Sequence, residues 1–452
     1  MSNGSYNSAK SHLIDSQELF DVLIDSSKYN GAKYLQILPL SDEIKPFFIS
    51  NSNITSGGND NEIIEFNKIL TYDNEEQGLT EVIILKESII QTFLNSFKLF
   101  KEKYINDDDD DDSDTVFNNE KYLISLIILI LTPEDHKFLN IHLKQFNLIY
   151  GENSNFLKFE INLIISLLTS NLPKTNKSSS LWELLKKLTI LKFQELNGLQ
   201  DIIKFINILI SCVFKSCKLH NRNYYGWSFM KFLINLIKLI EFNNNNNNNN
   251  NNNEIIINNL ILKFNDKIND FLNDFSFFNT YSNLLFNDLN ELTHTYNNIL
   301  RFSEKINNKI SLNNINELNF NFIFEQLIKL YNINNNLNLN SYSILFNFSI
   351  MLIKLNELTN NENENENEKI NEFFINYFND LKIKINKFKL NYKINEFKLI
   401  NNELNIIINN NSVKNINEFN YDLNFKNQLK LIEINLKILN FYNIYNNSNN
   451  NN

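Results

Sequence analysis

Side chains that could do chemistry are few and scattered in this chain. His136 and His142 lie six residues apart, with no cysteine nearby and without a conventional zinc spacing. Cys212 and Cys217 are separated by about 500° of helix rotation, so they do not share a helix face. The sequence has no glycine-rich phosphate loop and no Gly-x-Ser-x-Gly or His-Glu-x-x-His motif. We therefore expect no catalytic residue, metal site or cofactor in this chain. The five histidines are His12, His136, His142, His220 and His294.

The segment His220–Trp227 is the most informative stretch, reading His-Asn-Arg-Asn-Tyr-Tyr-Gly-Trp. The apolar residues before it recur at offsets 0, 3, 4, 7 and 11, and those after it at 0, 3, 7 and 10. Both spacings keep one face of a helix apolar. The segment is therefore predicted to be a polar turn between two helices, the second opened by a buried Trp227. The apolar residues are Ile202, Phe205, Ile206, Leu209 and Val213, then Trp227, Met230, Ile234 and Ile237.

Two earlier segments have the same helix–turn–helix layout, with turns at 132–137 and 171–180. The return helices place Leu139, Trp182 and Trp227 at spacings of 43 and 45 residues. Near-constant spacing of this kind indicates an α-solenoid. We expect Trp182, Trp227 and Asn223 to be structural residues of the repeat core.

The fold class predicted is all-α, an α-α superhelix of helical hairpins with an irregular N-terminal cap and Asn-rich disordered insertions. Asp107–Asp112 is interpreted as a disordered linker, because ordering an acidic run around a metal ion costs entropy. Asn243–Asn253 has no apolar residue to bury and is interpreted as a disordered insertion. The expected segments are a cap at 1–100, an acidic linker at 101–120, hairpin repeats at 121–242, an insertion at 243–253, further hairpin repeats at 254–442 and a disordered tail at 443–452.

Several helices are expected outside the three hairpins. Glu81–Phe100 and Tyr281–Phe302 each read as one helix, and Leu318–Tyr331 pairs with Tyr342–Leu358 as a hairpin. Leu381–Ile394 fits a strand or a helix, and the helical context favours the helix.

Composition bounds the compartment and the partners. The formal net charge of −10 falls close to neutrality once the acidic run is set aside, which does not resemble a basic nucleic-acid footprint. No segment has the roughly 20 apolar residues needed to span a bilayer, and residues 1–10 lack a signal-peptide pattern. Two cysteines indicate free thiols in a reducing compartment. We therefore expect a cytoplasmic protein without a transmembrane segment and without nucleic acid as a partner.

The hairpins resemble the repeats of the protein prenyltransferase α subunits, whose second helix begins Asn-Tyr-x-Ala-Trp-x-His-Arg. Asn223, Tyr224 and Trp227 match this motif, Gly226 replaces the alanine, and Phe229 and Met230 replace the His and Arg. The segment Leu35–Ile54 also looks like the N-terminal region of the divergent branch called protein prenyltransferase α-subunit repeat-containing proteins.

The resemblance implies a transferase subunit. In that family the repeats wrap a separate β subunit that carries zinc, and the heterodimer transfers an isoprenoid, here a geranylgeranyl group, to a cysteine of an acceptor protein. Arg222 and Tyr224 would then bind the isoprenoid diphosphate, because Arg offers two donors and a helix N-terminus favours anions. The alternative is that Arg222 is a solvent-facing turn residue and Tyr224 packs into the hairpin.

Two hypotheses of function follow. In the first, the chain is the non-zinc α-type subunit of a protein prenyltransferase, inactive alone. In the second, the chain is a non-catalytic helical-repeat scaffold for protein–protein interaction, because the lost His and Arg would leave a β subunit unbound.

Overall fold

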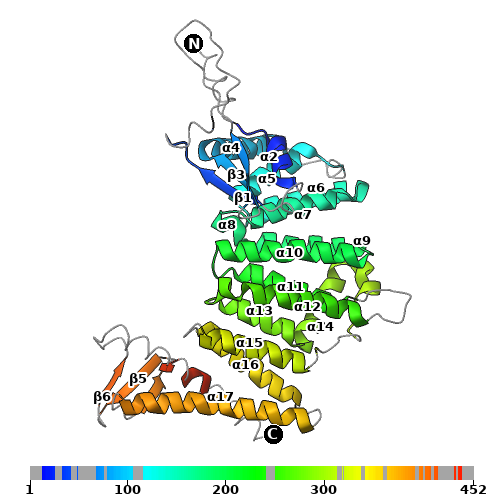
Figure 1. Ribbon diagram of the computed structural model, residues 1–452. Coiled ribbons are helices and arrows are strands. Elements are labelled where there is room, and N and C mark those ends of the chain that lie inside the picture. The colour runs from blue at the N-terminus through cyan, green and yellow to red at the C-terminus, as the bar shows by residue number, and fades with distance from the viewer. Residues whose placement is uncertain are drawn as a thin grey trace, which may run out of the picture. The chain divides into compact units, whose positions relative to one another are not determined.

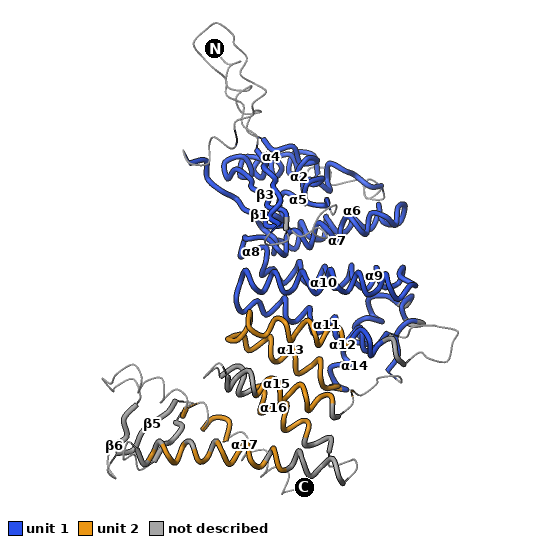
Figure 2. The backbone as a smooth tube through the Cα atoms, viewed as in Figure 1, with its two compact units in different colours: residues 1–256, 289–315 blue, residues 257–288, 316–452 orange. Residues whose placement is uncertain are grey.

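The computed structural model shows a chain built mainly of helices, which confirms the all-α, helical-repeat prediction. The chain divides into two compact units (Figure 2). Unit 1 comprises Met1–Ile256 and Leu289–Ile315, and unit 2 comprises Ile257–Asp288 and Asn316–Asn452. The structure describes residues 13–25, 33–41, 48, 68–75, 79–104, 116–240, 250–312, 318, 320–336, 342–359, 364–391, 396–400, 403–408, 412–415, 432–433 and 436–439.

Three consecutive helical hairpins form the body of unit 1, as the sequence predicts. The helices α7, α10 and α11 follow one another as successive layers (Figure 1). A one-turn helix, α8 (Pro173–Asn176), lies in the second turn. The hairpins are α5 (Asn119–Leu131) with α6 (His136–Glu152), α7 (Phe156–Leu168) with α9 (Ser179–Glu195), and α10 (Leu199–Leu219) with α11 (Tyr224–Leu239).

The helices begin where the sequence offers a short polar side chain. Asn118, Asp135, Ser178 and Asn223 each accept a hydrogen bond from a backbone N–H of the first helical turn. Such N-caps satisfy donors that have no partner within the helix. The return helices α6, α9 and α11 therefore all start at a polar residue that follows a turn.

Side chains of one turn bind the next turn at the junction of the first two hairpins. Glu134, in the first turn, accepts hydrogen bonds from Ser179 Oγ at 3.0 Å and from Ser180 Oγ at 2.8 Å. Thr175 Oγ1 donates to the carbonyl oxygen of Ile130 at 3.2 Å. These contacts join residues 45 or 46 positions apart, so the sequence period appears directly as a hydrogen-bonding period.

The second and third hairpins are joined in the same way, through a buried amide. Asn223 Nδ2 donates to Asn176 Oδ1 and to Ser216 Oγ, both at 2.9 Å. Its Oδ1 accepts from Gly226 N, so one side chain caps α11 and binds the preceding turn. Trp182 Nε1 donates to the same Asn176, at its carbonyl oxygen. The fully buried Asn223 therefore holds two hairpins in register.

The tryptophans fill the space between these hairpins. Trp182 and Trp227 are 1% and 2% exposed, and they contact the rings of Phe229 and Phe214. Gly226 is also closely packed, against Cys217 and Trp182. A Cβ there would be 3.0 Å from Cys217 Sγ, which explains why glycine replaces the alanine of the resembled motif.

The N-terminal cap contains a small sheet, of which the sequence indicates only the first strand, because Tyr34–Pro39 reads as a short extended segment. Its strands are β1 (Lys33–Leu38), β2 (Ile69–Asn74) and β3 (Leu79–Leu85), in the order β1-β3-β2. Strand β1 is parallel to β3, and β2 is antiparallel to it. The prediction of one helix over Glu81–Phe100 is wrong at its start. Residues 79–85 form strand β3, and helix α4 begins only at Lys86.

Two helices complete the cap, α2 (Ser16–Ile24) and α4 (Lys86–Tyr104). The cap is fastened to α7 and to the turn that follows it by three hydrogen bonds. Ser166 Oγ donates to Leu23 O, Thr169 Oγ1 donates to Lys33 O, and the backbone N–H of Asn171 donates to Leu35 O.

The predicted acidic linker is shorter than expected, since α4 runs to Tyr104 and α5 starts at Asn119. Asp107–Asp112 lies outside the described residues.

The chain returns to unit 1 through α14 (Leu289–Phe302) and the 3-10 helix η4 (Glu304–Lys309). Lys309 Nζ donates to the carbonyl oxygens of Phe193, Gln194 and Leu196 at the end of α9. A cation at a helix C-terminus is favoured by the helix dipole. This contact fixes the return segment against the second hairpin.

Unit 2 is also helical. The predicted hairpin is confirmed as α15 and α16, and the favoured helix over 381–394 is confirmed as far as Asn391. Tyr281 OH donates to Asn265 Oδ1, and Asn265 donates to Gln326. The elements are α12 (Asn250–Lys267), η3 (Ile268–Phe271), α13 (Phe275–Leu285), α15 (Phe320–Asn336), α16 (Tyr342–Thr359), α17 (Glu364–Asn391), β4 (Glu396–Ile400), β5 (Glu403–Ile408) and β6 (Ser412–Asn415).

Two expectations in this half of the chain are wrong. The stretch Tyr281–Phe302 is not one helix, because α13 ends at Leu285 and Phe286 has an extended backbone. Helix α12 starts at Asn250, so the end of the run at 243–253 is helical, while residues 241–249 lie outside the described residues. Asn253 Nδ2 donates a hydrogen bond to the backbone oxygen of Ile240. This tertiary contact supports the first turns of α12, and the amino-acid composition does not reveal it. The predicted tail at 443–452 also lies outside the described residues.

Among the helices that the structure describes, none combines the length and the apolar character needed to cross a bilayer.

Replacing Asn223 by Ala is expected to destabilise the protein by about 2–3 kcal/mol, because it removes an N-cap and leaves buried donors and acceptors unpaired. Urea unfolding measures this loss. Asn221→Ala is the control, since Asn221 is exposed on the same turn and its contact to Lys177 is made through its backbone oxygen. Equal stability of the two variants would contradict a bridging role for Asn223.

Glu134 makes the stacking of the turns sensitive to acid. Burial alone would raise the pKa of this carboxyl, but the hydrogen bonds from Ser178, Ser180 and Ser179 outweigh it and leave the pKa below its ordinary value of 4.5. The stabilising contribution is therefore complete above pH 4.5 and disappears as the pH falls through the lower, folded-state pKa.

We expect Glu134→Gln to lower the thermal midpoint at neutral pH and to converge on the parent protein in acid. Thermal scans between pH 7 and pH 3 test this, with the exposed Glu152→Gln as the control. A difference that stays constant over this range would show that the carboxylate charge is not what matters.

Candidate functional site

The two residues proposed from the sequence to bind an anion lie on the solvent side of the third turn. Arg222 is exposed and has a φ of 60°, an unusual conformation for a residue other than glycine. Tyr224 is 64% exposed, so it does not pack into the hairpin as the structural alternative proposed. Asn223, between them, is fully buried. The turn thus presents Arg222 and Tyr224 outward and holds Asn223 inward.

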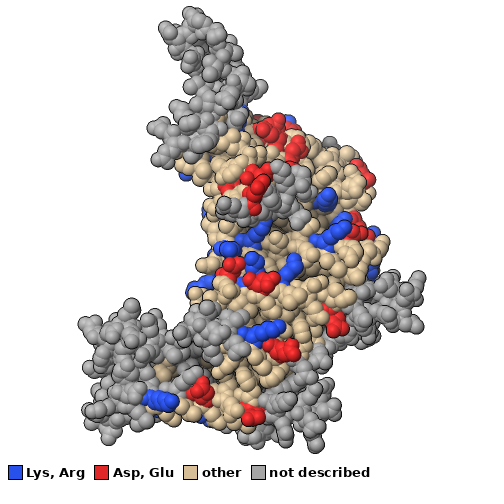
Figure 3. All heavy atoms as spheres, viewed as in Figure 1, with Lys and Arg blue, Asp and Glu red and all other residues tan. Residues whose placement is uncertain are grey.

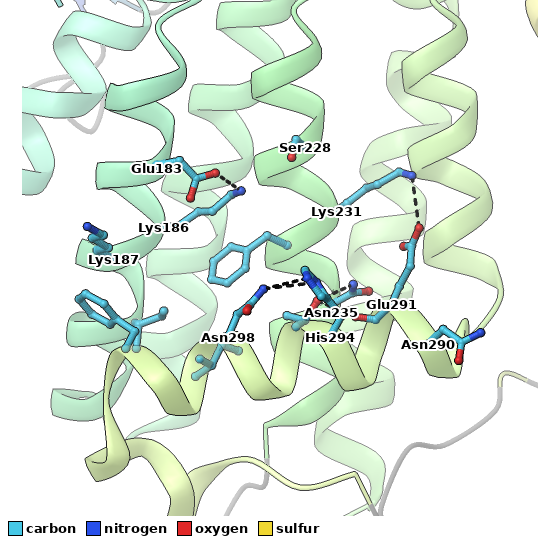
Figure 4. A pocket seen from close by; sticks show the side chains of 15 residues that line it. Glu183, Lys186, Lys187, Ser228, Lys231, Asn235, Asn290, Glu291, His294 and Asn298 are labelled. Carbon is cyan, nitrogen blue, oxygen red and sulfur yellow. Dashed lines mark hydrogen bonds and ion pairs between the residues drawn. The ribbon is translucent and has the colours of Figure 1, made fainter. Parts of the chain in front are cut away.

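A groove opens next to this turn, between helices α9, α11 and α14 of unit 1 (Figure 4). Its volume is about 620 Å³, and α14 runs across the other two helices. The sequence does not reveal this groove, because its walls come from segments about 110 residues apart. Each helix contributes one polar face: α9 contributes Glu183, Lys186 and Lys187, α11 contributes Ser228, Lys231 and Asn235, and α14 contributes Asn290, Glu291, His294 and Asn298.

Three lysines and two glutamates line the groove, so charges of both signs are present and positive charge is in excess. Lys186 pairs with Glu183 on the same helix, and Lys231 Nζ lies 3.9 Å from Glu291 Oε1. Lys187 Nζ lies 6.0 Å from the ring centroid of Phe302, at the limit of a cation–π contact. Lys187 has no carboxylate partner among the described residues. The groove therefore has a net positive wall at neutral pH.

The floor of the groove is apolar, and a hydrogen bond joins two of the helices that form it. Ile190 and Ile299 are 4% and 0% exposed. Asn235 Nδ2 donates to Thr295 Oγ1 at 3.1 Å, which ties α11 to α14. An apolar floor with a few charged side chains along the rim is the arrangement that binds another molecule by burial and orients it by charge.

A second polar cluster lies buried between the first two hairpins. Ser125 Oγ is 2.9 Å from His142 Nδ1, and His142 Nε2 is 3.0 Å from Glu160 Oε1. Tyr122 OH donates to the other oxygen of Glu160 at 2.6 Å. The order serine, histidine and carboxylate is that of a nucleophilic triad. All four side chains are no more than 1% exposed, however, so no substrate can reach the serine.

The cluster binds α5, α6 and α7 together through hydrogen bonds, and Ser125 Oγ also donates to the carbonyl oxygen of Tyr122, 2.6 Å away. Burial, and then the nearby Glu160, raise the pKa of Tyr122 well above its usual value and keep its proton in place.

The sequence did contain a signal for this cluster. Glu160 interrupts the apolar face of Leu157, Ile161 and Ile164, and a charge in such a position must be paired. His142 alone had no identifiable partner, because the partner lies on the next hairpin.

Other chemistry is absent from the part of the chain that the structure describes. No group of three or more His, Cys, Asp or Glu residues has an arrangement suited to a metal ion. The predicted free, buried thiols are confirmed, and burial raises the pKa of Cys212 to about 12, which keeps it as an unreactive thiol.

Fold and groove together define an all-α helical-repeat protein with a cationic groove. Sequence models of two domains match this chain, the ECM9 N-terminal domain over residues 9–169 and the ECM9 middle domain over residues 181–310. Each match spans less than half of the chain, and both are to domains of ECM9. The cluster around Glu160 lies in the first domain, and all the groove residues lie in the second.

One relative is Protein ECM9 of Saccharomyces cerevisiae, which is 27% identical over 162 residues. The match covers 35% of this chain and 40% of the relative, so the chain spans less than half the length of the relative that it matches.

The two domain matches correct the first functional hypothesis. The predicted prenyltransferase α-subunit family is wrong, since the domains that match are those of ECM9. The transferase activity, the geranylgeranyl substrate, the β-subunit heterodimer and the cysteine-containing acceptor are not supported. The expectation of zinc in a partner rested on the same resemblance and loses its basis. The physical reason is that Asn223, Trp182 and Trp227 serve the stacking of hairpins, which carries no information about a reaction.

Glu160→Ala is expected to destabilise the protein by about 3–5 kcal/mol, because it strands the buried His142 and Tyr122 without their partner. Glu152→Ala, at the exposed end of α6, should change stability by no more than about 0.5 kcal/mol. The free energy of unfolding in urea compares the two. A small effect at Glu160 would mean that the cluster does not hold the hairpins together.

Proposed function

We propose that this chain is a helical-repeat binding protein that acts by holding a segment of another protein in the groove between α9, α11 and α14. The observation that carries this proposal is the groove itself, in which an apolar floor lies beneath lysines from two different helices. Helical repeats stack into extended binding surfaces of this kind. This function keeps the second hypothesis drawn from the sequence and gives it a location.

The construction of the groove supports a binding role. Its three walls are held by contacts that do not involve its lysines: Asn235 to Thr295, and Lys309 at the end of α9. The surface is therefore preformed, and binding a partner would not carry the entropy cost of ordering it. The charged side chains stand on the rim, where they set orientation and association rate.

The test begins with a library of displayed random peptides selected on the purified full chain. At least one family of peptides is expected to lose affinity by about tenfold or more in Lys231→Glu and in Lys187→Glu, because charge reversal on a groove wall opposes complementary contacts. Fluorescence anisotropy with synthetic peptides measures the dissociation constants.

Lys204→Glu is the matched control. Lys204 is 75% exposed on α10, near Asp201, and lies outside the groove. Unchanged urea unfolding of all three variants ensures that only the surface differs. Selected peptides that bind all variants equally would contradict a binding function of the groove.

A further inference from the structure

The face of α11 that lines the groove continues beyond it to the third turn. Ser228, Lys231 and Asn235 line the groove, and Tyr224 precedes Ser228 by four residues. Positions at offsets 0, 4, 7 and 11 lie on one face of a helix. Tyr224 is 64% exposed, so this face is open to solvent where the groove ends.

Two neighbouring turns supply the cations Lys177 and Arg222 beside this end of α11. Lys177 Nζ donates to the carbonyl oxygen of Asn221 at 3.1 Å, which places its ammonium beside the residue that precedes Arg222. Neither Lys177 nor Arg222 forms an ion pair with a carboxylate of the described residues. The backbone of Arg222, at a φ of 60°, is held in place by the buried Asn223 that follows it. The turn therefore presents positive charge from a rigid support.

The charge of the whole path is positive in a protein whose formal net charge is −10. Lys186 and Lys231 have glutamate partners, whereas Lys177, Lys187 and Arg222 have none among the described residues. Glu134 lies close to the start of α9 and is occupied by hydrogen bonds from serines. Figure 3 shows basic and acidic side chains interspersed on the viewed face.

We propose that the partner segment is acidic and extended, and that it runs from the groove along α11 to Arg222 and Tyr224. This inference rests on the proposed binding function of the groove. Tyr224 and Asn235 are about 16 Å apart along the helix axis, which is the length of about five extended residues. Arginine and tyrosine are the side chains that most often dominate a binding interface, and exposed Arg222 and Tyr224 supply both.

The groove favours an acidic peptide over a nucleic acid. Glu183 and Glu291 stand among the lysines, and a continuous phosphate backbone would face both of them. A peptide can place its carboxylates opposite the cations and small or apolar side chains over the glutamates and the floor. Alternate side chains of an extended segment point in opposite directions, which suits such selection.

The peptides selected on the full chain test this inference. Those that depend on Lys231 are expected to be enriched in Asp and Glu, to bind more weakly as salt rises, and to lose about tenfold or more in affinity in Arg222→Glu. Tyr224→Ala should weaken them as well. Lys204→Glu, an exposed charge reversal on α10, should change the affinity by less than about twofold.

The possible outcomes separate the two proposals. Peptides sensitive to Lys231→Glu but not to Arg222→Glu, or not acidic, would overturn this inference and leave the groove as a binding site. Peptides sensitive to neither variant would overturn both proposals. Oligothymidylate that binds with the same dependence on Arg222 and Lys231, in the absence of acidic peptides, would assign the path to nucleic acid and overturn the inference.

Discussion

The fold of unit 1 depends on hydrogen bonds that join each turn to the next. Stacked hairpins can slide along one another, because apolar contacts alone do not specify a register. Hydrogen bonds between the side chains of successive turns do specify one, since a shifted register would break them. Glu134 serves this purpose at the first junction and Asn223 at the second. The cap, the return segment and the groove are all built on hairpins that these contacts align.

This constraint explains why a sequence motif predicted the fold correctly and the reaction wrongly. An asparagine that caps a helix and binds the preceding turn, followed by a tryptophan one turn later, is a solution to stacking hairpins. Any family that stacks hairpins of this length can arrive at it. Asn223 and Trp227 therefore support a helical-repeat architecture, while the domain matches show similarity to ECM9 and not to a prenyltransferase subunit. The turn residues that face solvent, Arg222 and Tyr224, are the ones free to serve binding.

The buried cluster and the groove show opposite uses of polar side chains. Ser125, His142 and Glu160 have the chemistry of a catalytic triad, but burial converts them into a structural bond between hairpins. Lys187 and Lys231 have ordinary chemistry, yet their place on the rim of an apolar groove gives them the means to select a partner. Exposure, more than residue type, separates structure from function in this protein.

The sequence by itself determined the helices of the three hairpins, their turns and their period, because these depend on the local spacing of apolar residues and on polar residues that cap helices. It also determined that Trp182 and Trp227 would be core residues by type. Only the tertiary structure decided the rest. The strand Leu79–Leu85 exists because β1 and β2 pair with it, and α12 reaches back to Asn250 through a contact with Ile240. The groove and the partner of His142 join residues on different hairpins, and pairings across such distances in the sequence leave no local pattern to read.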